Sequence, residues 1–111
     1  MATKQEVFQS LDEIRKMFDN PEVKEKFKGF KRSVQFKFSD VGANYVLRIS
    51  EEANATLAEE TIEKPDITIE MDSATFMGIR NKKISGTQAY ISGKLKVKGT
   101  MPDLLKLQRL M

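Results

Sequence analysis

The sequence predicts an α+β fold in which five strands form a sheet and helices cover its one apolar face. Two observations lead to this class. Hydrophobic residues recur at helical spacing in some segments and at every second position in others. The two kinds of segment also come in separate blocks: helices, three strands, a fourth strand, helices, a fifth strand and a last helix. Segregated blocks are typical of α+β proteins.

The first block is helical. Thr3 and Glu6 have the spacing of a capping box, in which each side chain satisfies a free backbone N–H group. Asn20 and Pro21 end this helix and begin a short second one, which we expect to end at Gly29. The first helix carries one apolar stripe, formed by Val7, Phe8, Leu11, Ile14 and Phe18.

The second block alternates with a period of two, which predicts half-buried strands. The first strand covers residues 33–39 and the second 45–49, with a turn over 40–44 between them. Residues 54–62 form a weaker pattern and are predicted to be an outer strand. The fourth strand covers 66–72. Its inward face would carry Ile67, Ile69 and Met71, and its outward face the polar residues.

The last block mixes helices with one strand. Asp72 or Ser73 can cap a helix, and a second helical piece follows from Ser85 and ends at Gly93. A final strand places its lysines outward, and Thr100 begins a terminal helix. The apolar residues predicted in these helices are Phe76, Met77, Ile79, Ala89, Tyr90, Ile91, Leu104, Leu105, Leu107, Leu110 and Met111.

Length and composition indicate a single domain over residues 1–111. The chain is 40% hydrophobic and 32% charged, which is globular rather than disordered composition. A net charge of +3 permits anionic partners without requiring one. The N-terminus lacks a signal-like apolar core, and no apolar run reaches the roughly 20 residues that span a bilayer. Together with the absence of cysteine, this predicts a cytoplasmic protein.

Several kinds of catalytic site are excluded. The chain has neither histidine nor cysteine, so a Ser-His triad, a cysteine nucleophile and a zinc site of thiols or imidazoles are impossible. No phosphate-binding glycine motif occurs either. Asp66, Glu70 and Asp72 could bind a hard cation, but on the outward face of a strand they are better explained as solvated surface. We therefore expect no enzyme activity, no cofactor and no metal.

Two surface features leave alternatives open. The basic cluster Lys24, Lys26, Lys28, Lys31 and Arg32 lacks the interleaved aromatic residues of a nucleic-acid platform. A solvated face is the favoured interpretation, and weak contact with an anionic membrane is the second. The apolar stripe of the first helix could lie in a membrane interface, although such stripes usually face the protein's own core.

Fourteen hydrophobic residues point, by periodicity, into the layer between sheet and helices. A filled core and a lined cavity give the same pattern, and periodicity alone favours a core. The methionines favour a cavity slightly, because methionine adapts to irregular contents. The fourteen are Phe36, Phe38, Leu47, Ile49, Ile67, Ile69, Phe76, Ile79, Tyr90, Ile91, Leu95, Val97, Leu104 and Leu107.

A family resemblance changes this balance. "PDITIEMDSATFMGI" (65–79) and "SGKLKVKGTMPDLLKLQ" (92–108) resemble the sterol carrier protein 2 domain family. The resemblance implies a five-stranded, mostly antiparallel sheet and a hydrophobic tunnel, lined by these fourteen residues, that holds fatty acids, fatty acyl-CoA or sterols. Where animal members tend to carry two phenylalanines and a glutamine, this chain has Tyr90, Ile91 and Ser92. A polar contact from that glutamine is therefore not expected.

The resulting hypothesis is a non-enzymatic lipid-binding and transfer protein. Arg80, Lys82 and Lys83 are candidates to contact a charged head group at the tunnel mouth, with surface solvation as the alternative. The terminal helix or the Phe76 helix would move to admit the lipid. An alternative is an accessory or protein-interaction module that presents acyl substrates to a partner enzyme. The chain stops after the family's last helix, which suggests a stand-alone protein or an excised domain.

Overall fold

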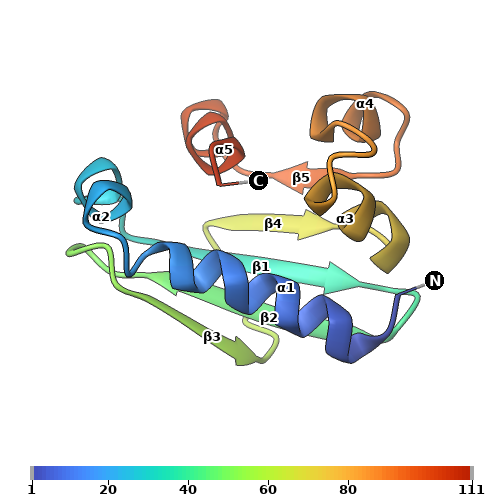
Figure 1. Ribbon diagram of the computed structural model, residues 1–111, viewed down its shortest axis with the longest axis horizontal. Coiled ribbons are helices and arrows are strands. Elements are labelled where there is room, and N and C mark those ends of the chain that lie inside the picture. Colours follow the sequence, from blue (N-terminus) through green and yellow to red (C-terminus); the bar gives the residue numbers. More distant parts are fainter. Residues whose placement is uncertain (1, 111) are drawn as a thin grey trace.

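The computed structural model describes residues 2–110, which form helices and strands in the predicted order (Figure 1). The elements are α1 (Lys4–Met17), α2 (Pro21–Phe27), β1 (Arg32–Phe38), β2 (Ala43–Ile49), β3 (Ala55–Glu59), β4 (Ile67–Glu70), α3 (Ser73–Arg80), α4 (Gly86–Ile91), β5 (Lys96–Lys98) and α5 (Met101–Gln108). The predicted α+β class is confirmed. Met111, predicted to belong to the apolar face of the last helix, lies outside the described residues.

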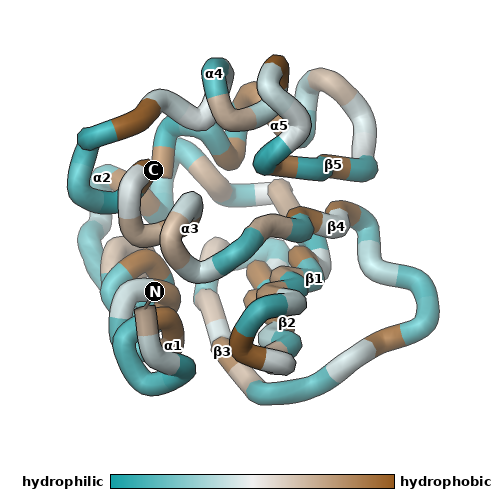
Figure 2. The backbone as a smooth tube through the Cα atoms, turned by 90° about the vertical axis from the view of Figure 1, so that its right-hand side faces the viewer, coloured by the Kyte–Doolittle hydropathy of each residue, from teal (hydrophilic) through white to brown (hydrophobic). Residues whose placement is uncertain are grey.

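The five strands form one sheet in the order β3-β2-β1-β4-β5. Neighbouring strands are antiparallel except β1 and β4, which are parallel and pair Val34 with Ile67. The sheet is therefore mixed but mostly antiparallel, and β3 is an edge strand as predicted. Seen along the strands, the helices gather on one face of the sheet, while the chain between β3 and β4 runs along the other (Figure 2).

Helix boundaries follow the capping residues. The hydroxyl of Thr3 accepts a hydrogen bond from the Glu6 amide at 3.1 Å, and the Glu6 carboxylate accepts one from the Thr3 amide at 3.0 Å. The side chain of Asn20 caps α2 by accepting a hydrogen bond from the Glu22 amide, and that of Thr100 caps α5 by accepting one from the Asp103 amide. Gly29 follows α2 with a φ of 82°, a conformation that glycine adopts without strain.

The closed core lies under α1. The predicted stripe packs onto the sheet, and Val7, Leu11, Ile14 and Phe18 are all at most 2% exposed. The stripe therefore faces the protein's own core, the interpretation favoured from the sequence. Below it, the ring of Phe38 lies 5.2 Å from that of Phe76, measured between centroids. Such aromatic contacts add to the burial energy of a core.

The connection between β3 and β4 closes the other face. Since β3 is an edge strand, residues 60–66 must cross behind β2 and β1 to reach β4. Gln35, which strand alternation turns to the face away from the helices, is fully buried beneath this crossover. Its Nε2 donates to the Glu60 carbonyl at 2.9 Å and its Oε1 accepts from the Ile62 amide at 2.9 Å. A buried polar side chain is tolerated there because the crossover backbone satisfies it.

Within residues 2–110, no helix combines the length and the apolar character that crossing a bilayer requires.

Candidate functional site

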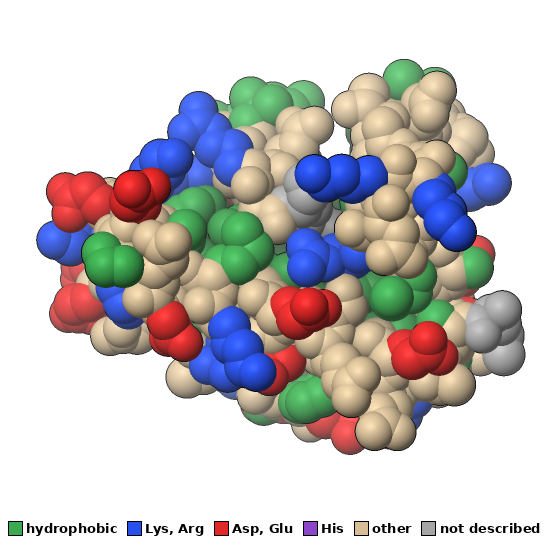
Figure 3. All heavy atoms as spheres, viewed as in Figure 1, with side chains coloured by type: hydrophobic (Ala, Val, Ile, Leu, Met, Phe, Trp, Pro, Cys, Tyr) green, Lys and Arg blue, Asp and Glu red, His purple; other side chains and the backbone are tan. Residues whose placement is uncertain are grey.

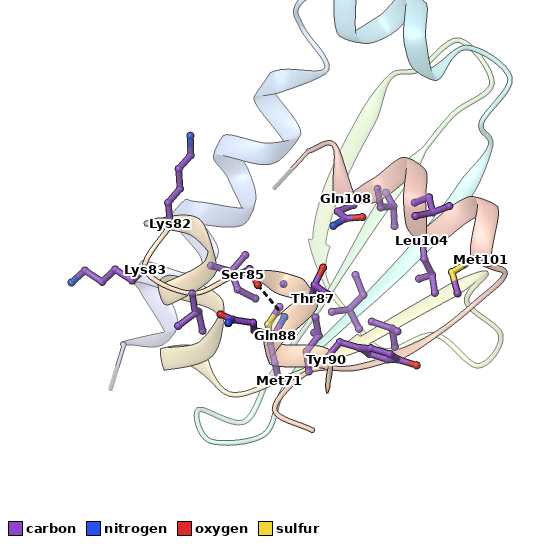
Figure 4. Close-up of a pocket in the computed structure, with 18 residues that line it drawn as sticks. Met71, Lys82, Lys83, Ser85, Thr87, Gln88, Tyr90, Met101, Leu104 and Gln108 are labelled. Atoms are coloured by element: carbon purple, nitrogen blue, oxygen red, sulfur yellow. Dashed lines mark hydrogen bonds between the residues drawn. The ribbon is translucent and has the colours of Figure 1, made fainter. Parts of the chain in front are cut away.

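A pocket of about 690 Å³ lies between the β4–β5 side of the sheet and the two helices α4 and α5 (Figure 4). Its floor comes from Ile69 and Met71 at the end of β4 and from Leu95 and Val97 around β5. Alternation in β4 turns Ile69 and Met71 to the same side, so the strand pattern itself builds this floor.

Helical residues form the walls. Leu104 and Leu107 project from α5, Tyr90 projects from α4, and Ile79 comes from the end of α3. Ile84, in the turn between α3 and α4, completes the wall. Gly78 makes room for it, because a Cβ atom at Gly78 would lie 3.1 Å from Ile84 Cδ1.

Polar groups occupy the rim. Ser85, Thr87 and Gln88 lie at the start of α4, and Gln108 lies at the end of α5. The Ser85 hydroxyl accepts a hydrogen bond from the Gln88 amide at 3.0 Å, drawn as a dashed line in Figure 4. A pocket with an apolar interior and a few polar groups at its edge is the usual form of a site for a small apolar molecule.

The mouth opens between α4 and α5. Tyr90, Met101 and Leu105 line the pocket and yet remain 56%, 66% and 57% exposed. The molecular outline is notched between the two helices in the space-filling view (Figure 3). The pocket is therefore accessible from solvent through a partly apolar opening.

Two contacts hold α5 in place. The Arg32 Nε donates to the Asp103 carboxylate at 2.8 Å, which ties the start of α5 to β1 and raises the pKa of the Arg32 guanidinium. The ammonium group of Lys106 lies 5.4 Å from the ring centroid of Phe27 and 5.8 Å from that of Phe30. None of the residues that make these two contacts lines the pocket.

The structure divides the fourteen residues predicted from the sequence. It brings seven of them together around the pocket: Ile69, Ile79, Tyr90, Leu95, Val97, Leu104 and Leu107. Six others do not line the pocket, because they lie in the closed core beneath α1 and α3: Phe36, Phe38, Leu47, Ile49, Ile67 and Phe76. Ile91 does not line it either. Ile91 is 77% exposed. The helix α4 turns only Ala89 into the protein, and Ile91 remains on its outer side.

The head-group candidates are divided as well. Lys82 and Lys83 belong to the pocket rim, and their side chains extend outward from it (Figure 4). Arg80 does not line the pocket. Its Nε donates to the Ser10 hydroxyl at 3.0 Å and its Nη1 lies 3.5 Å from the Leu110 carbonyl oxygen, so this side chain connects α1 to the chain end.

Several lining residues were not among the fourteen. Met71 continues the inward face of β4, so the alternation already pointed to it. Leu105 was predicted on the apolar face of the last helix but was not assigned to the site, whereas Ile84, in a turn, and Met101, the first residue of α5, gave no periodic signal. The uncharged polar residues of the rim were also missed, because nothing in the sequence distinguishes Thr87 or Gln108 from ordinary surface residues.

Fold and site together define an α+β domain with an apolar pocket between one side of its sheet and two short helices. The model of the SCP-2 sterol transfer family matches residues 11–111, and the chain belongs to this family. It is 31% identical over 106 residues to hydroxysteroid dehydrogenase-like protein 2 of Xenopus laevis. That match covers 84% of this chain but 25% of the relative, so the chain spans about a quarter of that protein.

Solved structures share the fold. Sterol carrier protein 2 like 2 of Aedes aegypti superposes with a TM-score of 0.71 at 13% identity, over 97% of this chain and 98% of that one. A palmitated form of the mosquito protein gives a TM-score of 0.53 at 15% identity, over 70% and 68%. The sterol carrier protein domain 2 of Helicoverpa armigera gives 0.67 at 25% identity, over 93% and 85%.

Proposed function

We propose that this protein is a non-enzymatic lipid carrier that holds one fatty acid, fatty acyl-CoA or sterol-like lipid in the pocket beneath α4 and α5. The observation that carries the proposal is an apolar pocket of about 690 Å³ in a chain whose remaining core is closed. Membership of a sterol transfer family supports it. The palmitated form of the Aedes aegypti protein favours a fatty acyl chain as the first ligand to test.

The energetics of such binding are adequate. Removing a dozen methylene groups from water contributes about 10 kcal/mol at roughly 0.8 kcal/mol each. Lost ligand freedom and the ordering of side chains offset much of this, which leaves affinities in the micromolar range or tighter. Selectivity for chain length would be low, because one methylene discriminates poorly in an apolar pocket.

The proposal assigns roles to the lining residues. Ile69, Leu95 and Val97 would contact the acyl chain from the sheet side, and Leu104 and Leu107 from α5. A charged head group would lie at the rim, where Lys82 and Lys83 supply positive charge. The six predicted residues in the closed core are left out of this assignment.

Ligand displacement tests the proposal. Leu104→Trp places a larger side chain into the pocket, and we expect it to weaken binding of a fluorescent fatty acid at least tenfold. Phe8→Trp is the matched control, since Phe8 is 38% exposed on α1 and does not line the pocket. Native mass spectrometry of the purified protein should show a co-purified lipid. No bound lipid and no displacement at micromolar concentration would refute the proposal.

A second candidate is an accessory role in which the domain presents acyl substrates to an enzyme. It is favoured by one observation: the match covers 25% of hydroxysteroid dehydrogenase-like protein 2 of Xenopus laevis and 19% of that of Xenopus tropicalis. Kinetics of an acyl-CoA-consuming enzyme with and without this chain test it. We expect a lower KM for the lipid substrate if the chain presents substrate, and unchanged kinetics if it acts as a carrier alone.

A further inference from the structure

The pocket has a polar end and an apolar end. Thr87 and Gln88, in the first turn of α4, and Gln108, the last residue of α5, supply polar lining. Tyr90, late in α4, and Met101, the first residue of α5, supply exposed apolar lining. In Figure 4, Thr87 and Gln108 accordingly lie toward one end of the pocket, and Tyr90 and Met101 toward the other. The two helices therefore separate the polar lining from the apolar lining.

Charge follows the same division. Among the described residues that line the pocket, Lys82 and Lys83 are the only charged ones, and none is acidic. Both lie in the turn before α4, at the polar end, and neither forms an ion pair with another residue of the range 2–110. An anionic ligand group is therefore attracted to this end, whereas a cationic group is repelled from it.

The polar end can also hydrogen-bond a carboxylate. The hydroxyl of Thr87 and the side-chain amide of Gln108 are both donors. Neither side chain hydrogen-bonds to another described residue, so no internal contact has to be broken before they bind a ligand. Hydrogen bonds that end on an ionised oxygen are stronger than those between neutral groups. Two donors beside two lysines thus suit the carboxylate of a fatty acid.

The apolar end offers no such contacts. Tyr90, Met101 and Leu105 line it while 56%, 66% and 57% exposed, and the Tyr90 hydroxyl lies at the outer tip of its ring (Figure 4). A carboxylate placed among these side chains would lose hydration without gaining hydrogen bonds, which costs free energy. A hydrocarbon chain has no polar group to lose, so the end of the chain is favoured at this position.

We propose that the pocket binds a fatty acid in one orientation, with the carboxylate held by Thr87 and Gln108 and the methyl end between Tyr90 and Met101. The chain between the two ends lies over the apolar floor around Ile69. This proposal rests on the proposed lipid-carrier function and adds to it a direction and a head-group site. Esters of the same fatty acid lack the charged group and lose the advantage of that site.

Single-tryptophan reporters measure the orientation, since the chain contains no tryptophan. Gln88→Trp reports on the polar end and Met101→Trp on the apolar end. Each variant is titrated with stearic acid that carries a nitroxide quencher either near the carboxylate or near the methyl end. We expect Gln88→Trp to be quenched more strongly by the first label and Met101→Trp by the second. The conservative change Tyr90→Trp repeats the measurement at the apolar end.

The outcomes separate this proposal from the carrier function. A reversed pattern, or equal quenching by both labels in all variants, would overturn the orientation and leave the carrier function standing, because the lipid is still bound. No quenching together with no displacement of a fluorescent fatty acid would overturn both.

Removal of the two donors tests the head-group site. The double variant Thr87→Val and Gln108→Leu should bind stearate at least about fivefold more weakly, since each charge-assisted hydrogen bond contributes to affinity. Binding of methyl stearate should change less than about twofold, because the ester has no charge to lose. Gln9→Leu, an exposed glutamine on α1 that does not line the pocket, is the control and should affect neither ligand. An equal change for stearate and its ester, or no change for either, would overturn the assignment of the carboxylate to Thr87 and Gln108.

Discussion

The two sides of the sheet differ in how completely they are covered. The face of β1 and β2 toward α1 is packed, and the crossover of residues 60–66 covers part of their other face, above Gln35 and Val46. The β4–β5 side is covered on one face only, by α4 and α5, and contains the pocket. Similar alternating strands therefore lead to a packed core in one place and to a cavity in the other, depending on the helix above them.

The covering helices explain the difference. The helix α1 has 14 residues and a continuous apolar stripe, whereas α4 has six residues and α5 has eight. Only Ala89 of α4 is buried, and α5 is anchored away from the pocket by Arg32 and Lys106. Short helices with few inward side chains cannot fill the space above β4 and β5, and a cavity remains.

The largest expected effect is a loss of stability that differs between a core residue and a pocket residue. Phe38→Ala removes a ring that is 1% exposed and should lower the free energy of unfolding by about 3–5 kcal/mol. Leu104→Ala enlarges an existing pocket and should cost less than about 1.5 kcal/mol, because fewer packing contacts are lost. Urea denaturation of both variants measures this. Equal losses would show that the pocket side is packed as tightly as the core.

A second prediction concerns the back of the closed side. Gln35→Leu leaves the carbonyl of Glu60 and the amide of Ile62 without their partner, and should destabilise the protein by about 1–3 kcal/mol. Gln108→Leu, at the exposed pocket rim, is the matched control and should stay within about 0.5 kcal/mol. If both glutamines can be replaced without loss, the crossover is not held by Gln35.

A smaller effect is expected where α5 is attached. Asp103→Asn weakens the ion pair with Arg32 and should cost up to about 1 kcal/mol of stability, because the pair is only partly buried. The looser helix should release a bound fluorescent fatty acid several-fold faster in stopped-flow measurements. Glu25→Gln, which removes the exposed pair with Lys28 on α2, is the control and should leave the release rate unchanged.

The smallest effect depends on pH and concerns the contact between Asp40, in the turn after β1, and Ser73, at the start of α3. Asp40 accepts hydrogen bonds from the amide and hydroxyl of Ser73, at 2.9 and 2.6 Å, which hold the pKa of its carboxyl below the ordinary 3.8. A lowered pKa stabilises the fold above 3.8, and this contribution disappears as the pH falls through the folded-state value. Asp40→Asn should cost less than about 1 kcal/mol near neutral pH, with a difference that shrinks on acidification. A difference that grows in acid would contradict this assignment.

Local features could be read from the sequence with good accuracy. The capping residues Thr3, Asn20 and Thr100, the strand alternation and the edge position of β3 are all confirmed. They are determined by neighbouring residues and by simple periodicity. The mixed strand order and the burial of Gln35 were beyond this reasoning, since both depend on where a connection passes in space.

The pocket could be predicted only in part. Periodicity gives the side on which a residue lies, so it correctly separated Ile69 and Val97 from their polar neighbours. It does not tell whether a helix fills the space opposite, so it could not distinguish Phe38 in the core from Leu104 at the pocket. Ile84 lies in a turn, where no periodicity applies, and was missed for that reason.

The parallel contact between β1 and β4 has a consequence for the order of assembly. The strands β1, β2 and β3 follow one another as antiparallel hairpins, whereas β4 joins β1 only after the intervening chain has crossed the sheet. Pairings between distant segments close larger loops and form later. We expect the cavity to be completed last during folding, on a platform that is already stable, and to be the first part of the protein to open when its backbone amides exchange with deuterium.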